Sequence, residues 1–155
     1  MNAYADASAL VKGYIKERGS VEFVEFANAA TNVATGLITR AEVAATFGKA
    51  VRVGAVSDMV ARRLLSKFRE EWLSLTKVQV LDTVVEQADV YAYEYGLRGY
   101  DAIHLACALT WQRAIQAPVV MATFDQDLWL VAQRLGLAVF PTDLARYVSR
   151  TPRKN

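Results

Sequence analysis

Residues 3–12 have the sequence Ala3-Tyr4-Ala5-Asp6-Ala7-Ser8-Ala9-Leu10-Val11-Lys12, in which a short apolar run passes into a helical pattern with no linker between them. The pattern of residues 3–6 predicts a β-strand. Serine is a common first residue of helices, so Ser8 can cap a helix that follows the strand. We expect a helix from Ser8 to about Lys16, with its apolar side chains on one face. A strand that leads directly into a helix is the unit from which α/β proteins are built.

The alternation of strand and helix continues along the rest of the chain. Further strands are predicted at residues 33–38, 77–81, 119–122 and 138–140. Further helices are predicted at residues 21–28, 40–53, 57–72, 83–95, 100–116 and 125–135. Strands that are joined by helices pair in parallel, and the helices then cover both faces of the sheet. The sequence therefore predicts the α/β class, with a central, mostly parallel sheet flanked by helices.

The composition limits the class of protein. A chain of 155 residues that is 54% hydrophobic and 22% charged can fold as one domain and is too apolar for a disordered chain. Its longest run without Asp, Glu, Lys or Arg is residues 26–39, and a membrane-spanning helix needs about 20 apolar residues. Asp6 interrupts the apolar stretch of a signal peptide, and the lone Cys107 permits no internal disulfide. We expect a cytoplasmic protein with no membrane segment.

The net charge of +2 identifies no partner, but the charges are unevenly distributed. Residues 1–80 carry eleven basic and eight acidic side chains, whereas residues 81–149 carry four and eight. The end of the chain then adds Arg150, Arg153 and Lys154. We expect a single domain over residues 1–148 and a basic tail over residues 149–155. This distribution suits either an ordinary mixed surface or a surface that binds a polyanion next to bound metal.

Four acidic residues stand where predicted strands end or helices begin. They are Asp6 after the first strand, Glu42 after the second, Asp101 after the loop Gly96-Leu97-Arg98-Gly99, and Asp125 after the strand at residues 119–122. Ligands of parallel α/β sheets bind where strands end and helices begin. We therefore expect these four carboxylates, from four separate segments, to converge on one edge of the sheet.

Each acidic residue also has a purely structural explanation. Residues 39–42 fit a capping box, and Asp6 can cap the first helix. Asp101 and Asp125 stand near helix starts, where the helix dipole stabilises a negative charge. Four like charges in one crevice nevertheless require compensation, and oxygen ligands suit Mg²⁺ or Mn²⁺. Such an ion can orient a water, lower its pKa and stabilise the oxyanion that leaves a phosphodiester.

Four segments together form a more specific pattern, and they extend over nearly the whole chain. They are residues 4–12, Thr39-Arg40-Ala41-Glu42-Val43, residues 96–106 and Thr123-Phe124-Asp125-Gln126-Asp127-Leu128. In content and order these segments resemble those of the PIN-domain ribonucleases. The closest resemblance is to the VapC-like toxins of bacterial and archaeal type II toxin–antitoxin systems.

The resemblance implies a metal-dependent endoribonuclease with Mg²⁺ or Mn²⁺ as its cofactor. It maps the acidic quartet onto Asp6, Glu42, Asp101 and Asp125, with Asp6 and Asp101 in direct contact with the metal. Ser8 and Thr123 either support the carboxylates by hydrogen bonds or only cap helices. Asp127 is an auxiliary acidic residue or a plain surface charge.

The resemblance also implies partners: an RNA substrate, a VapB-like antitoxin that obstructs the acidic crevice, and a second copy of the chain in a homodimer. Arg40 and Arg98 are candidates for RNA phosphates, with surface solvation as the alternative. Apolar residues in the region of residues 43–72 either form core or contact the antitoxin. The candidates for that contact are Phe47, Leu64, Phe68 and Trp72.

Other small α/β folds fit the sequence less well. A receiver-type signalling domain needs adjacent acidic residues after its first strand and a late lysine, whereas Asp6 stands alone and residues 78–153 contain no lysine. A haloacid-dehalogenase-like phosphatase needs Asp-x-Asp, and Ser8 occupies the second position. The remaining alternative is a catalytically silent PIN-like module that binds RNA or protein.

Overall fold

The computed structural model describes residues 1–147, which contain a five-stranded sheet in the order β3-β2-β1-β4-β5. Every neighbouring pair of strands is parallel. The strands are β1 (Asn2–Ala5), β2 (Asn32–Gly36), β3 (Thr76–Val78), β4 (Val119–Ala122) and β5 (Ala138–Phe140). The expected α/β class with a parallel sheet is therefore confirmed.

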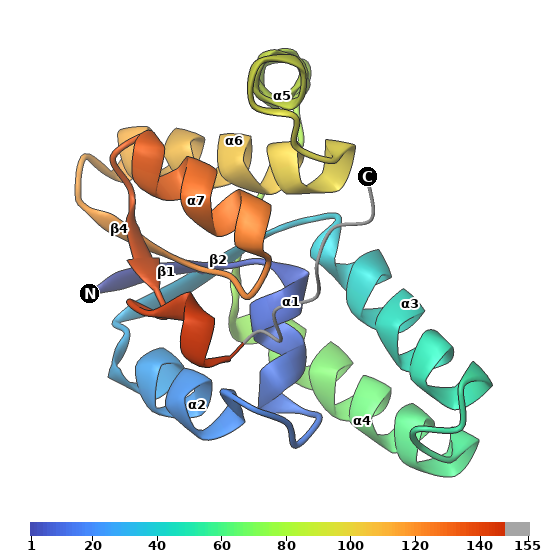
Figure 1. The fold of residues 1–155 in the computed structure, drawn as a ribbon. Helices are drawn as coiled ribbons and strands as arrows, with labels where there is room; N and C mark the ends of the chain where they lie inside the picture. Colours follow the sequence, from blue (N-terminus) through green and yellow to red (C-terminus); the bar gives the residue numbers. More distant parts are fainter. Residues whose placement is uncertain (148–155) are drawn as a thin grey trace.

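Helices cover both faces of the sheet, with α5, α6 and α7 on one side and α1, α2 and α4 on the other (Figure 1). The helices are α1 (Ala7–Leu10), α2 (Ser20–Ala29), α3 (Thr39–Arg52), α4 (Asp58–Glu71), α5 (Asp82–Tyr95), α6 (Gly99–Ile115) and α7 (Gln126–Arg134). Short 3₁₀ turns form η1 (Val11–Gly13), η2 (Trp72–Ser74) and η3 (Leu144–Arg146). Among the described residues, no helix is long and apolar enough to span a membrane.

The sheet separates the hydrophobic core into parts. Tyr4 and Met121 point to the side of α5, α6 and α7, where they pack with Leu105 and Leu128. Ala5 and Ala122, the next residues along β1 and β4, pack on the opposite side with residues of α1 and α2. This alternation follows from the period of two in a β-strand, and it fixes which residues of β1 face each helical layer.

A third part of the core lies between α1, α3 and α4, and it corrects one expectation. Phe47, Phe68 and Trp72 are packed there and are almost fully buried, while Leu64 is half-buried. Three of the four candidates for antitoxin contact are thus internal, because the helical hairpin α3–α4 folds its apolar stripes against each other and against Val11. Most of each stripe is therefore core in this structure, and Leu64 is the candidate whose side chain stays partly accessible.

The first helix is shorter than expected. The sequence suggested a helix from Ser8 to about Lys16, but α1 ends at Leu10 and continues as the turn η1 to Gly13. Its cap is Asp6, whose carboxylate accepts a hydrogen bond from the Ala9 amide. The chain then turns, and Lys12 Nζ donates to the backbone oxygen of Arg18 at 2.8 Å across that turn.

The third strand is likewise shorter than the expected residues 77–81. It forms only over Thr76–Val78, where it pairs with β2 at the edge of the sheet. The expected basic tail at residues 149–155 lies outside the described residues.

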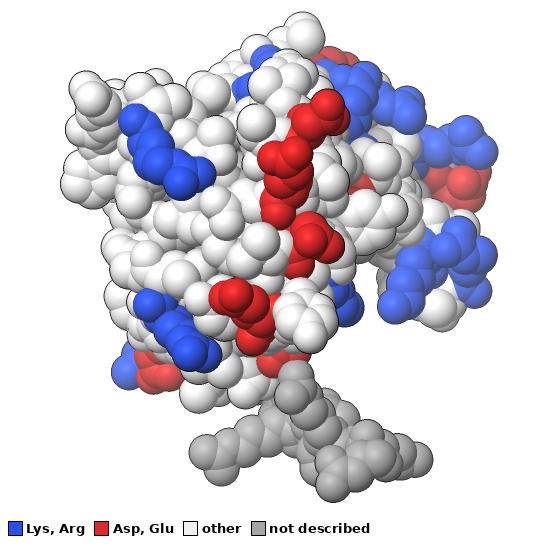
Figure 2. All heavy atoms as spheres, turned by 90° about the horizontal axis from the view of Figure 1, so that it is seen from above, with Lys and Arg blue, Asp and Glu red and all other residues white. Residues whose placement is uncertain are grey.

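Charged side chains are grouped on the surface. Figure 2 shows a strip of acidic side chains on the face of the molecule that carries α5, with basic side chains toward the side of α3 and α4. The composition of these elements explains both features. Residues 82–95 include four acidic and no basic side chains, whereas residues 39–71 include seven basic and four acidic ones.

Candidate active site

A pocket of about 380 Å³ lies at the carboxyl edge of the parallel sheet, and it is lined by Asp6, Glu42, Asp101 and Asp125. Each residue comes from a different element. Asp6 follows β1, Glu42 is in the first turn of α3, Asp101 is in the first turn of α6, and Asp125 caps α7. The structure thus brings the four predicted acidic residues to one pocket.

Asp6 is held by three hydrogen-bond donors from two segments of the chain. The Ser8 hydroxyl lies 2.8 and 2.9 Å from its two carboxylate oxygens, and the Thr123 hydroxyl donates to Oδ2 at 2.7 Å. The Ala9 amide donates to Oδ1 at 2.8 Å. Asp6 is only 3% exposed, so these bonds fix its carboxylate at the floor of the pocket.

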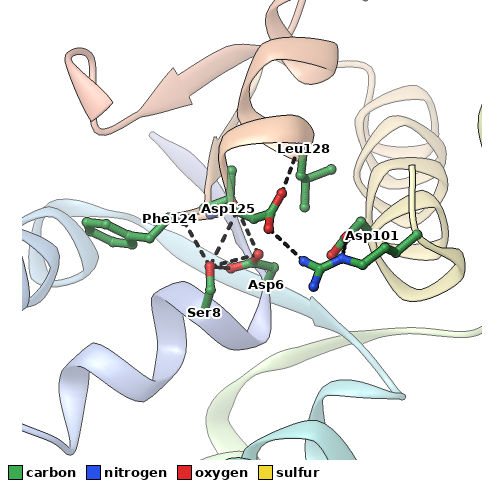
Figure 3. A network of polar contacts seen from close by, with 8 residues as sticks. Asp6, Ser8, Asp101, Phe124, Asp125 and Leu128 are labelled. Carbon is green, nitrogen blue, oxygen red and sulfur yellow. Dashed lines mark hydrogen bonds and ion pairs between the residues drawn. The ribbon is translucent and has the colours of Figure 1, made fainter. Parts of the chain in front are cut away.

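Ser8 and Thr123 also join the segment after β1 to the segment after β4, and Figure 3 shows Ser8 beside Asp6 and Phe124. Ser8 Oγ accepts a hydrogen bond from the Phe124 amide at 2.9 Å, and Thr123 Oγ1 accepts one from the Asp125 amide at 3.1 Å. Both hydroxyls therefore donate to Asp6 and accept from the backbone next to Asp125. Their role here is to position two acidic residues, and neither hydroxyl caps α1.

Glu42 is oriented by His104. Glu42 Oε2 lies 2.7 Å from His104 Nε2, and His104 Nδ1 lies 2.9 Å from the Tyr4 hydroxyl. The possible capping-box partner, Thr39, instead shares a 2.7 Å hydrogen bond with the hydroxyl of Thr35. The carboxylate of Glu42 therefore faces the pocket.

Asp101 and Asp125 are bridged by a single arginine. Arg98 Nε donates to Asp101 Oδ2 at 2.7 Å, and Arg98 Nη2 donates to Asp125 Oδ2 at 2.6 Å (Figure 3). The two carboxylates belong to different helices, α6 and α7, so the guanidinium ties their N-terminal ends together. One positive charge is thus shared by two of the four carboxylates, which offsets half of their combined negative charge.

Burial is the main influence on the pKa values of two carboxyl groups in the pocket, Asp6 and Asp101. Burial raises the pKa of the Asp6 carboxyl, and His104, Thr123, Ala9 and Ser8 act in the opposite direction. Burial also raises the pKa of the Asp101 carboxyl, which the hydrogen bond from Arg98 lowers and the charge of Asp125 raises. Negative charge is therefore unfavourable in this pocket unless a cation is near.

Residues 3–134 match the family model described as "PIN domain". The chain belongs to the PIN-domain family. Ribonuclease VapC45 of Mycobacterium tuberculosis (strain CDC 1551 / Oshkosh) is 30% identical over 142 residues, which are 91% of this chain and 96% of the relative. This PIN domain is therefore a VapC-like member of the family.

Solved structures share the same fold. PAE2754 from Pyrobaculum aerophilum superposes with a TM-score of 0.61 at 23% identity, covering 94% of this PIN domain chain and 88% of that chain. VapBC-5 from Mycobacterium tuberculosis, described as a member of the VapBC family of toxin-antitoxin systems, superposes with a TM-score of 0.52 at 20% identity, covering 89% and 94%. At these identities the likeness concerns the fold alone.

The donor set of this PIN domain fits a hard divalent cation in its chemistry. All four acidic side chains offer oxygen ligands, and Mg²⁺ commonly binds through one or two carboxylates while keeping several waters. Within residues 1–147, no three His, Cys, Asp or Glu side chains are gathered as a ready ligand group. The Oδ2 atoms of Asp101 and Asp125 are instead joined by Arg98.

The remaining predicted residues have separate positions. Asp127 is in the first turn of α7 outside the residues that line the pocket, and its charge contributes to the raised pKa of Arg98, whose chief cause is Asp101. Arg40 lies with its guanidinium 5.7 Å from the centre of the Trp72 ring, also outside the pocket lining. Only Arg98, of the two arginines proposed for RNA, belongs to the pocket.

Sequence reasoning missed Lys12 as a residue of the pocket. Lys12 is buried, pairs with Glu17 at 3.0 Å, and places its Nζ 4.2 Å from the centre of the Phe124 ring. Both Lys12 and Glu17 line the pocket. The available signal was the position of Lys12 in the segment that carries Asp6, where a lysine on the inner side of a helix needs a partner.

Proposed function

We propose that this PIN-domain chain is a Mg²⁺- or Mn²⁺-dependent endoribonuclease and the toxin of a type II toxin–antitoxin pair. The observation that carries the proposal is the convergence of four carboxylates from four elements on one pocket. The name of the relative Ribonuclease VapC45 supports RNA as the substrate, since the two sequences align over nearly their whole lengths. We place its action in the cytoplasm, where RNA substrates are accessible.

In this proposal Asp6 and Asp101 bind the ion directly, and Glu42 and Asp125 complete the site or act through water. The bound ion activates a water for attack on the phosphodiester and stabilises the leaving oxyanion. Ser8 and Thr123 keep the Asp6 carboxylate oriented toward the pocket. Asp127 adds negative charge near the N-terminus of α7, close enough to act on Arg98.

RNA reaches the pocket, in this proposal, from the side of α3 and α4. That side carries the excess of basic side chains, whereas the acidic strip on α5 repels a polyanion (Figure 2). Arg98 lines the pocket and is the better placed candidate for a phosphate contact. Arg40 is exposed at the start of α3 and contributes from outside the pocket.

The proposed partner is a VapB-like antitoxin, and the proposed assembly contains two copies of the chain. The fold shared with VapBC-5 supports the antitoxin. Because Phe47, Phe68 and Trp72 are internal, we assign the contact on α4 to Leu64 together with Met59 and Val60, which are 70% and 41% exposed. In this proposal the bound antitoxin suppresses RNA cleavage by obstructing the acidic pocket.

One observation favours a second candidate function, a catalytically silent module that binds RNA or protein. Arg98 already pairs with both Asp101 and Asp125, so a pocket that never exchanges this arginine for a metal ion would not hydrolyse RNA. The two functions share the fold and the basic surface, and they differ only in metal binding and cleavage.

The deciding experiment uses the purified full chain, freed of antitoxin, with RNA and Mg²⁺ or Mn²⁺. We expect cleavage that EDTA stops, and we expect Asp6→Asn and Asp101→Asn to abolish cleavage while leaving the circular dichroism spectrum unchanged. Asp58→Asn is the matched control, because Asp58 is an exposed aspartate on α4 that pairs with Arg62. If the wild type and both site variants bind RNA equally and none cleaves it, the silent module is the correct function.

A further inference from the structure

Arg98 bridges two of the carboxylates to which we assign the divalent cation. Its Nε and Nη2 atoms donate to Asp101 Oδ2 and Asp125 Oδ2 at 2.7 and 2.6 Å. These are short, charge-assisted bonds. Arg98 lines the same pocket as Asp6 and Glu42. The guanidinium is therefore the cation that bridges two of the pocket's four carboxylates.

A guanidinium and a divalent ion compete for these oxygens. Arginine stays protonated at any ordinary pH, and Asp101 raises the pKa of Arg98 further. A metal ion that used Asp101 Oδ2 or Asp125 Oδ2 would bring two positive charges within a few ångströms of the guanidinium. Without water between them, charges this close repel strongly. Each cation therefore weakens the binding of the other at these carboxylates.

The position of Arg98 in the fold makes its departure easy. Its side chain is 75% exposed, whereas those of Asp101 and Asp125 are 14% and 24% exposed. It precedes α6 in the short loop between Gly96, which has φ of +67°, and Gly99. Exposed ion pairs contribute little net free energy, so a dication that binds the more buried carboxylates can displace the arginine.

We propose that Arg98 is a built-in competitor for the metal: it bridges Asp101 and Asp125 and offsets one of their two negative charges in the metal-free protein, and it is displaced when a divalent ion binds. This inference rests on the proposed metal dependence and adds to it a regulation of the same site. The arrangement keeps two neighbouring carboxylates from repelling each other in the absence of metal. It also releases the guanidinium for an RNA phosphate once metal is bound.

The test is calorimetric titration of the metal-free full chain with Mn²⁺, without RNA. Arg98→Gln removes the charge, Arg98→Lys keeps the charge but loses the two-pronged geometry, and Arg62→Gln is the control. Arg62 makes the same kind of bond, from Nε to Oδ2 of Asp58 at 2.7 Å, between two exposed side chains of α4. Neither residue lines the acidic pocket. Arg62→Gln therefore reports the effect of losing one positive charge at a distance. Thermal melts check that each variant is folded.

We expect Arg98→Gln to bind Mn²⁺ about two- to thirtyfold more tightly than the wild type, which corresponds to the loss of two exposed or half-buried ion pairs. Arg98→Lys should lie between the two, and Arg62→Gln should match the wild type. Equal or weaker Mn²⁺ binding by Arg98→Gln would overturn the competition while leaving the proposed metal dependence intact. If neither the wild type nor Arg98→Gln binds Mn²⁺, the metal-dependent function itself fails.

Discussion

His104 Nε2 lies 2.7 Å from Glu42 Oε2, although the two residues are 62 positions apart in the sequence. The imidazole is almost completely buried, and its other nitrogen lies 2.9 Å from the Tyr4 hydroxyl. A line of polar groups thus runs from the interior of β1, through α6, to the carboxylate of Glu42 at the pocket. A buried polar line of this kind fixes geometry, because a misplaced member leaves another without its partner.

Tyr4→Phe should destabilise the protein and disturb Glu42 through His104. The change removes one hydroxyl from a fully buried position and leaves His104 Nδ1 without that partner, which costs about 1–3 kcal/mol in the free energy of unfolding. Chemical denaturation measures this value. Tyr93→Phe is the control, because Tyr93 is 92% exposed and its loss of a hydroxyl should change stability by less than about 0.5 kcal/mol.

In the proposed metal site His104 positions Glu42, so its replacement should weaken metal binding without removing a carboxylate. We expect His104→Leu to lower Mn²⁺ affinity and RNA cleavage by about 10- to 100-fold, as for other groups that orient metal ligands. His104→Gln keeps a donor near Glu42 and should recover part of both. A merely structural role would give two variants whose metal affinity equals that of the wild type at temperatures where both are folded.

The sequence predicted the order of strands and helices because each element has a strong local pattern. The helix predicted at residues 57–72 begins with Ser57, which caps α4 by accepting a hydrogen bond from the Val60 amide, and Gly96 ends α5 with a positive φ. The first helix was predicted too long because its apolar pattern continues past the point where long-range contacts turn the chain. The bond from Lys12 to the backbone of Arg18 is one such contact.

The convergence of the acidic residues could also be predicted, because it follows from their positions at strand ends. The partners that come from distant segments were harder to predict. The pattern around Glu42 suggests a capping box, in which Glu42 would bond to the backbone. The packing of α6 over the sheet instead makes His104 the partner of Glu42. Arg98 is three residues before Asp101, so that pair was within reach of sequence reasoning, but its bond to Asp125 depends on how α7 lies beside α6.

Gly36→Ala should destabilise the protein, because Gly36 leaves space for the polar line. A Cβ at this position would lie 2.9 Å from the Tyr4 hydroxyl and 3.6 Å from Cys107 Sγ. A buried side chain would have to move to relieve this close contact, which should lower the free energy of unfolding by about 1–3 kcal/mol. Thermal and chemical denaturation measure the effect. In contrast, Gly48→Ala in α3 should stabilise by about 0.5–1 kcal/mol, since its nearest neighbour is the flexible end of Arg52.

Asp6→Asn should make the metal-free protein more stable while removing its response to metal. Burial raises the pKa of Asp6 in the folded chain, so the folded state holds this proton more tightly than the unfolded state does. The stability that the protonated carboxyl contributes is present below the unfolded pKa and is lost as the pH rises through the raised folded pKa. An amide avoids this loss at neutral pH and can still accept the hydrogen bond from the Ala9 amide.

The measurement is the melting temperature of the metal-free wild type, Asp6→Asn and Asp58→Asn as a function of pH, with and without Mn²⁺. Above the raised pKa of Asp6, Asp6→Asn should melt several degrees higher than the wild type, and the difference should shrink as the pH falls. Mn²⁺ should raise the melting temperature of the wild type and of Asp58→Asn, because a ligand that binds only the folded state stabilises it, and should leave Asp6→Asn unchanged. A variant at Asp6 that melts below the wild type at neutral pH would mean that its three hydrogen bonds to the ionised carboxylate outweigh the cost of burial.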